Sequence, residues 1–306
     1  MQRRMRWIKL GLIVDPHKKK TVGVSHVSVP CARHLRDDTF RIYYSERDGQ
    51  SRSLPTWVDV DIIRPDRILD AADTAMFSLG EPGCFDDSGI TPTWLLTHEG
   101  TDYLYFVGWN LGRSVPFRNA LGLAIRPAGQ SQFRKYSNGP ILDRSIHDPC
   151  FVASASILVH SGYWHMWYLS CVRWETTPAG MRHYYHLKYA TSADGIHWER
   201  TGKVAIDFAS ADEYAISRPS VLATANGFQM WYSYRGDRYR IGYAESRDGV
   251  EWTRLDHLVG IDVSAEGWDA QMVEYPCVFD HNGRRYMLYN GNRYGETGIG
   301  LAVLAA

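Results

Sequence analysis

The chain has 306 residues, of which 44% are hydrophobic and 13% aromatic, and it carries 34 basic and 34 acidic side chains. This balance gives no overall field that would draw the protein onto nucleic acid or an anionic membrane. No stretch approaches the roughly 20 apolar residues that a membrane helix requires, and the five cysteines have no CxxC spacing, so neither a disulfide framework nor a zinc site is indicated.

The amino-terminal segment begins with basic residues and then turns apolar, as a secretory signal does. Its apolar part is short, is interrupted by Lys9, and runs into Asp15 and Pro16 without a small-residue cleavage site. We therefore expect Leu10 to Val14 to be a strand that completes the last unit of the fold. We also expect a cytoplasmic protein with reduced thiols and no membrane partner.

A two-part pattern recurs along the rest of the chain. Each copy begins with a proline followed by small or apolar residues, and an aromatic-rich run comes next. The prolines are Pro30, Pro92, Pro149, Pro219 and Pro276, with spacings of 62, 57, 70 and 57 residues, and the aromatic runs are IYYS, YFVG, MWYL, MWYS and MLYN. Aromatic residues favour strands, so each copy predicts two strands, the first of them innermost.

Each copy continues into a third apolar run, and two copies then reach an Asp-Gly turn. The third runs are TWVDVDI at 56–62, GLA at 122–124, KYA at 188–190, GYA at 242–244 and GLA at 300–302. Asp194 and Asp248 precede the turn glycines, a hairpin signal that gives both a structural role. Residues 1–306 are thus predicted to be one all-β domain, a five-bladed β-propeller. Ile68 to Phe77 offers at most a turn or two of helix.

Antiparallel strand order puts the segments before the prolines at the same end of the channel as the loops between second and third strands. Acidic residues gather there, with Asp87, Asp148 and Glu274 as candidate catalytic groups and Glu213 and Asp269 expected at the rim. Aromatic rings stack on sugar rings and planar polar groups bond hydroxyls, so we expect a carbohydrate partner. The substrate-binding candidates are Trp109, Asn110, Arg118, Asn119, His147, Tyr185, Arg218, Arg235 and Asn290.

Each of these residues also has a structural interpretation. Asp148 could cap a turn before its proline, Asp87 lies in a DDSG turn, and Arg218 could pair with a buried carboxylate. Arg118, Asn119 and Arg218 would otherwise bind hydroxyls or an anionic substituent. The histidines have no metal-ligand spacing, so neither a metal nor another cofactor is predicted.

At these residues the chain resembles the five-bladed propeller glycoside hydrolases of families 43, 32, 68 and 130. The HDP at 147–149 is similar to their RDP or IDP motif, whose Asp positions substrate or tunes the acid, and the EYP at 274–276 is similar to the EGP-type motif that bears the general acid. A resemblance over nearly the whole chain is to family 43-like propeller proteins associated with surface-polysaccharide biosynthesis, through FDDSG, VPFRNA, ILDRS, YAESRDGVEW and EYPCVFD. The propeller also resembles the amino-terminal region of plant enzymes that glycosylate inositol phosphorylceramide.

The resemblance implies a glycosidase-like enzyme that cleaves or transfers a glycosyl unit between two carboxyl groups. It assigns the acid to Glu274, the base or nucleophile to Asp87, and sugar positioning or tuning of the acid to Asp148. The first copy, SHVSVP at 25–30, lacks the Asp that families 43 and 32 place there. Either the carboxylates are permuted or the catalytic set is incomplete. The alternative is therefore a non-catalytic carbohydrate-binding module that docks a glycan for a partner glycosyltransferase.

Overall fold

The computed structural model describes residues 4–18 and 22–306. Strands dominate this part of the chain. The helical elements described are the 3-10 turn η1 (Asp256–Leu258) and the four-residue turn α1 (Asn292–Gly295). The strands are β1 (Trp7–Val14), β2 (Ser25–Arg36), β3 (Thr39–Arg47), β4 (Ser53–Asp61), β5 (Ile68–Ala71), β6 (Gly89–His98), β7 (Thr101–Leu111), β8 (Phe117–Arg126), β9 (Arg134–Lys135), β10 (Phe151–His160), β11 (Tyr163–Thr177), β12 (Gly180–Ser192), β13 (Glu199–Ile206), β14 (Ala215–Thr224), β15 (Gly227–Arg235), β16 (Tyr239–Ser246), β17 (Thr253–Arg254), β18 (Glu274–His281), β19 (Arg284–Asn290) and β20 (Ile299–Leu304).

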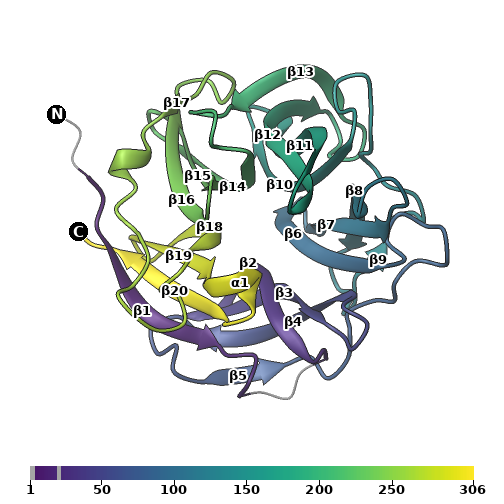
Figure 1. The fold of residues 1–306 in the computed structure, drawn as a ribbon. Coiled ribbons are helices and arrows are strands. Elements are labelled where there is room, and N and C mark those ends of the chain that lie inside the picture. The colour runs from purple at the N-terminus through teal and green to yellow at the C-terminus, as the bar shows by residue number, and fades with distance from the viewer. Residues whose placement is uncertain (1–3, 19–21) are drawn as a thin grey trace.

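The strands form antiparallel groups in chain order, and Figure 1 shows these groups arranged around a common centre. The groups are β2 to β5, β6 to β9, β10 to β13 and β14 to β17, followed by β18 to β20 together with β1. The runs that the sequence marked as second and third strands fall in β3 and β4, β7 and β8, β11 and β12, β15 and β16, and β19 and β20. This nearly all-β, propeller-like arrangement agrees with the predicted fold class.

The first strand of each group faces the centre. Strands β2, β6, β10, β14 and β18 each contact the next, and β18 returns to β2. Small polar side chains link these inner strands. The amide N–H groups of Ala155, Val221 and Val278 donate to Thr93 Oγ1 (3.0 Å), Ser156 Oγ (3.0 Å) and Ser220 Oγ (2.8 Å) of the preceding inner strand. Such bonds satisfy amides that the sheet ladders leave free, and they hold the inner strands at fixed separations.

Each inner strand shifts register against its second strand near its middle. The shifts lie between Ser28 and Cys31, Pro92 and Trp94, Ala153 and Ala155, Ser217 and Ser220, and Glu274 and Cys277. Proline has no N–H and is tolerated where a ladder is interrupted. Four of the marker prolines therefore lie inside inner strands, at or beside these shifts.

The third marker proline does not follow this rule. Pro149 precedes β10, and the register shift of that strand lies at Ser154, with no proline at or beside it. The prediction that every marker proline begins an innermost strand is therefore wrong for this copy. Asp148, one residue earlier, is consequently placed outside the inner strand.

The two ends of the described chain meet in one sheet. Strand β1 pairs with β20, with Lys9 opposite Ala302 and Leu12 opposite Gly300. This confirms that Leu10 to Val14 completes the last unit. The helical alternative for Ile68 to Phe77 is wrong, because Ile68–Ala71 forms β5 on the edge of β4.

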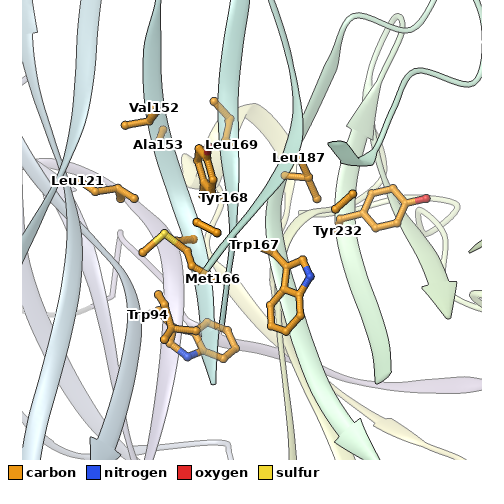
Figure 2. Close-up of a cluster of buried hydrophobic side chains, with 14 of the residues drawn as sticks. Trp94, Leu121, Val152, Ala153, Met166, Trp167, Tyr168, Leu169, Leu187 and Tyr232 are labelled. Carbon is orange, nitrogen blue, oxygen red and sulfur yellow. The ribbon is translucent and has the colours of Figure 1, made fainter. Parts of the chain in front are cut away.

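The core lies between neighbouring groups of strands, and Figure 2 shows part of it around Met166, Trp167 and Tyr168. Trp167 is buried and its indole N–H donates to the carbonyl of Gly249 (2.7 Å), in the Asp-Gly turn of the next group. Tyr105 bonds the Gly195 carbonyl in the same way (2.8 Å). Asp194 and Asp248 each accept two backbone N–H bonds of their own turns. The structural role predicted for both is confirmed.

Within the described residues, no helix is long and apolar enough to cross a membrane.

Candidate functional site

A cavity of about 450 Å³ lies where the groups of strands converge. All the inner strands contribute to its wall, together with the ends of several second strands and the starts of several third strands. Its lining residues are Ser28, Val29, Ser45, Arg47, Ser51, Ser53, Thr91, Val107, Trp109, Phe117, Asn119, Phe151, Ala153, Ser154, Leu169, His183, Tyr185, Ser217, Arg218, Arg235, Tyr239, Tyr275 and Tyr294. The two Asp-Gly turns contribute none of these residues, so the cavity lies at the end of the ring away from them.

The backbone is strained where it borders the cavity. Val29, Arg218 and Tyr275 each precede a proline, and their φ angles are 60°, 49° and 55°. Residues before proline normally adopt extended conformations, and a left-handed β-branched residue such as Val29 is rare. Strain of this kind costs about 1–3 kcal/mol per residue and concentrates at functional sites. All three residues line the cavity.

Aromatic rings supply much of the cavity wall. The Tyr185 and Tyr239 hydroxyls are hydrogen-bonded to each other, and the Phe151 and Tyr185 ring centroids are 6.3 Å apart. Trp109 directs its indole N–H to Ser53 Oγ (3.3 Å) and keeps its ring at the cavity. Apolar faces beside fixed hydroxyls are suited to stacking on sugar rings while bonding their hydroxyl groups.

Arg235 lies among these aromatic rings. Its guanidinium donates to the Tyr294 hydroxyl (2.6 Å) and lies 5.4 Å from the centre of the Tyr239 ring and 5.1 Å from that of Tyr214. These contacts are cation–π in character. Tyr294 belongs to α1, where Arg293 and Tyr294 adopt left-handed backbone, and Ser28 Oγ donates to the Tyr294 carbonyl. The turn between β19 and β20 is thereby fixed over one side of the cavity.

Arg218 is fully buried beneath the cavity. Its guanidinium donates to the carbonyls of Pro30 (2.6 Å), across the centre of the ring, and Pro219 (3.4 Å), while its Nε has no partner. No carboxylate of the described chain forms an ion pair with it. Of the alternatives for Arg218, pairing with a buried carboxylate is therefore wrong, and its place in the cavity lining agrees with the substrate-contact alternative.

Glu274 is the carboxyl group beside the cavity. It opens β18 opposite Asn290, is 0% exposed, and neither of its oxygens has a hydrogen-bond partner in the described chain. Burial raises its pKa well above the ordinary value, and the Tyr294 backbone and the Arg235 guanidinium only partly offset this. The group therefore holds its proton to a higher pH than an ordinary glutamate does, and it lies among residues that line the cavity.

Asp148 lies elsewhere, in a buried cluster of its own. Its oxygens accept bonds from Ser145 Oγ (2.9 Å), Arg200 Nη1 (2.9 Å) and Tyr168 OH (3.2 Å), and Lys188 Nζ is 3.6 Å away. None of these residues lines the cavity. The structure does not bring Asp148 to Glu274.

Asp87 also bonds within its own loop. Its carboxylate accepts hydrogen bonds from the Gly83 N–H (2.9 Å) and Ser88 Oγ (2.8 Å). These bonds agree with the structural interpretation of Asp87 as a turn residue. Glu213 and Asp269, expected at the rim, are instead buried and paired with Arg254 (2.7 Å) and Lys9 (2.6 Å). That prediction is wrong, because both carboxylates fasten loops to strands.

The predicted binding residues divide into two sets. Those in the cavity lining are Trp109, Asn119, Tyr185, Arg218 and Arg235, and those outside it are Asn110, Arg118, His147 and Asn290. Asn290 is buried and bonds the backbone of Val27, Val29 and Gly298, so it holds the α1 turn against β2. His147 gives its carbonyl to Lys188. Arg118 is exposed on β8.

Sequence reasoning missed several lining residues, among them Arg47, His183, Tyr239 and Tyr294. Tyr239 could have been found, since it precedes its Tyr-Ala pair by the same offset as the predicted Tyr185 does. Tyr294 lies in a left-handed turn between two strands, where local sequence gives no indication that its ring turns inward.

His183 provides a pH signature of the site. Burial, with the Arg235 charge as a second cause, lowers its pKa to about 4, and its ring stacks on Tyr185 at 4.7 Å. In the unfolded chain the His183 imidazole takes up a proton as the pH falls through its ordinary pKa of 6.5, whereas in the folded chain it does so only near pH 4. The contribution of His183 to stability is therefore lost as the pH falls from 6.5 towards 4, and it does not change above 6.5. Urea unfolding of His183→Phe across this range should show a flatter profile. The exposed His257→Phe should keep the wild-type slope, and an unchanged slope in His183→Phe would refute the assignment.

Comparison with known proteins identifies two relatives that match this chain over almost its whole length. No model of a known protein family matches the chain. Two proteins of Mycobacterium tuberculosis, "Uncharacterized protein Rv1502" of strain H37Rv and "Uncharacterized protein MT1551" of strain CDC 1551, are each 41% identical over 300 residues, which covers 98% of this chain and 99% of the relative.

Solved structures with the same fold are more distant in sequence. A structure described as "Glycoside hydrolase" has a TM-score of 0.73 at 17% identity and covers 98% of this chain and 92% of its own. A thermostable family-43 glycoside hydrolase has a TM-score of 0.64 at 12% identity, covering 92% and 89%. A third, from work on mannoside phosphorylases and hydrolases of the GH130 family, has a TM-score of 0.67 at 17% identity, covering 98% and 94%. At these identities the likeness shows the propeller-like glycoside hydrolase fold.

Proposed function

This chain belongs to the family of the Mycobacterium tuberculosis proteins Rv1502 and MT1551, and we propose that it is a carbohydrate-active enzyme of the glycoside hydrolase type. It cleaves or transfers a glycosyl unit in the central cavity. In this proposal each group of strands is one blade of a five-bladed propeller, and the substrate is a glycan of polysaccharide metabolism handled in the cytoplasm. The glycoside hydrolase fold of its structural neighbours supports the carbohydrate class.

The observation that carries the proposal is Glu274. A fully buried carboxyl group without a hydrogen bond costs stability, and it persists where the surrounding structure serves another purpose. A raised pKa keeps such a group protonated near neutral pH, which is the state that a general acid requires. Tyr239, Tyr275 and Arg235 lie next to it and line the cavity.

The chemistry follows from that protonated state. The proton on Glu274 passes to the glycosidic oxygen as the bond from the anomeric carbon to that oxygen breaks. Water, or the hydroxyl of an acceptor sugar, forms the new bond to the anomeric carbon and gives up its own proton to a base. Asp87 remains the proposed base or nucleophile, whereas Asp148, bonded to Arg200 and Tyr168 outside the cavity lining, is given a structural role in this proposal. For Asp87 to act, the turn at 83–88 must release its carboxylate towards the cavity.

One observation favours a second candidate function. No aspartate or glutamate is among the residues that line the cavity, whereas glycosidases place two carboxyl groups on either side of the scissile bond. A cavity with aromatic walls and no carboxylate on its surface suits a non-catalytic module that presents a glycan to a partner glycosyltransferase.

The test separates the two functions at the same site. The protein is incubated with oligosaccharides and nitrophenyl glycosides, products are followed by mass spectrometry, and binding is measured by calorimetry. Trp109→Ala removes a stacking wall and should weaken both binding and turnover by about tenfold or more, because such contacts are worth about 1–2 kcal/mol. Trp198→Ala is the control, because Trp198 is a half-buried tryptophan outside the cavity lining, and it should change neither binding nor turnover. Turnover supports the enzyme, and binding without turnover supports the module. The absence of both binding and turnover would refute both functions.

A further inference from the structure

The charges lining the cavity are of one sign. Arg47, Arg218 and Arg235 lie on its wall, and no aspartate or glutamate does. Acidic side chains elsewhere in the described chain form ion pairs with arginines outside the cavity lining. Examples are Asp59 with Arg41 (2.7 Å) and Glu213 with Arg254 (2.7 Å). The cavity has been left with an excess of positive charge.

None of the three cavity arginines has a carboxylate partner within the described residues. Arg218 bonds two backbone carbonyls and has a free Nε. Arg235 bonds the Tyr294 hydroxyl and faces aromatic rings. Arg47, at the end of β3, forms no ion pair and donates no side-chain hydrogen bond in the described chain. Arginines in such sites keep several N–H donors available for a planar or tetrahedral anion.

The neighbouring acidic groups do not cancel this charge. Burial raises the pKa of Glu274, which favours the uncharged form of its carboxyl group. His183 contributes no charge at neutral pH, since its pKa is lowered to about 4. The Cys277 thiol, whose pKa the Cys31 thiol and Arg218 lower to about 7, lies off the cavity lining and balances Arg218 at most. Arg47 and Arg235 remain without compensation.

We propose that the sugar bound in this cavity is anionic, carrying a carboxylate, as in a uronic acid, or a phosphate ester. The aromatic rings would hold the pyranose, and Arg47 and Arg235, with Arg218 beneath them, would bind the anion. This inference rests on the proposed function and names its substrate class. A volume of about 450 Å³ falls within the range of roughly 300–1,000 Å³ found for small-ligand sites.

The test compares matched ligands that differ only in charge. Calorimetry is run with methyl glucuronide against methyl glucoside, methyl galacturonide against methyl galactoside, and mannose 6-phosphate against mannose. We expect at least one anionic member to bind about tenfold or more tightly than its neutral partner, with an affinity that falls as salt rises. The uronide and phosphate arms distinguish which anion the site prefers.

The variants Arg47→Gln and Arg235→Gln should each remove most of that preference. Arg64→Gln is the control, because Arg64 is exposed and pairs only with Asp61. Arg235→Lys should retain part of the preference, since the charge remains while the fork of donors is lost. Circular dichroism confirms that each variant is folded.

Two outcomes would overturn the inference, and only the second of them would also reject the proposed function. Equal affinity for neutral and anionic partners, with binding still lost in Trp109→Ala, would reject the anionic class and leave a carbohydrate site. No binding and no turnover of any sugar would reject both.

Discussion

Replacing Glu274 with glutamine is expected to lower turnover by about 10²–10⁴-fold while leaving sugar binding and the fold intact. Glutamine has the same shape as the protonated acid and donates a hydrogen bond, but it cannot release a proton to the departing oxygen. The loss should be largest for substrates whose leaving group is a sugar hydroxyl. It should shrink for nitrophenyl glycosides, because a nitrophenolate departs without protonation. Steady-state kinetics on both substrate types provides the measurement.

Glu213→Gln is the matched control, since Glu213 is also a buried glutamate but is paired with Arg254 outside the cavity lining. It should lose stability and keep the wild-type ratio between the two substrate types. If Glu274→Gln slowed both substrate types equally, or slowed neither, Glu274 would not be the proton donor.

The same substitution has a pH signature in stability. The folded chain holds the Glu274 proton above the pH at which the unfolded chain, with an ordinary carboxyl pKa of 4.5, releases it. The unfolded state is therefore favoured increasingly as the pH rises above 4.5. Glu274→Gln removes this linkage, so it should be more stable than the wild type at neutral pH and equal to it below pH 4.5. Denaturant unfolding across this range would show it.

Asp148→Asn is expected to have the second large effect, on folding. Removing the charge leaves Arg200, at 2.9 Å, and Lys188, at 3.6 Å, without their buried partner. Breaking a buried ion pair from one side costs about 3–5 kcal/mol. Unfolding curves should show this loss, while the folded fraction keeps its affinity for sugar because Asp148 lies outside the cavity lining.

Asp143→Asn is the control, because Asp143 is half-buried on the same loop and its side chain pairs only with Arg144. A double-mutant cycle with Arg200→Gln should give a coupling energy well above that of a surface pair. If Asp148→Asn folded with wild-type stability and lost turnover, the role that the motif resemblance gave it would stand and the structural role would fall.

The repeat could be read from the sequence because its signals are local. Aromatic second strands, Asp-Gly turns and strand-breaking prolines each follow from the chemistry of a few adjacent residues. Glu274 was found for the same reason, since it stands two residues before Pro276. The prediction failed for the third copy, because its register shift lies at Ser154, where no proline marks it, and Pro149 lies outside the strand.

The rest of the site depends on distant residues that no local pattern records. Arg218 reaches the Pro30 carbonyl from 188 positions away, and Ser28 donates to the Tyr294 carbonyl from 266 positions away. Whether an acidic residue faces the cavity or an internal cation depends on such contacts. That is why Glu274 and Asp148, which look equivalent beside their prolines, lie in different environments.

The pairing of β1 with β20 makes the order of synthesis matter. Residues 7–14 leave the ribosome long before their partner strand at 299–304 is made. During translation the segment around Ile13 and Val14, buried in the finished protein, has nothing to pack against. Until 299–304 has been made, the hydrogen-bonding edge of β1 is unpaired, so a chain released before that point would leave β1 without its partner and open to aggregation.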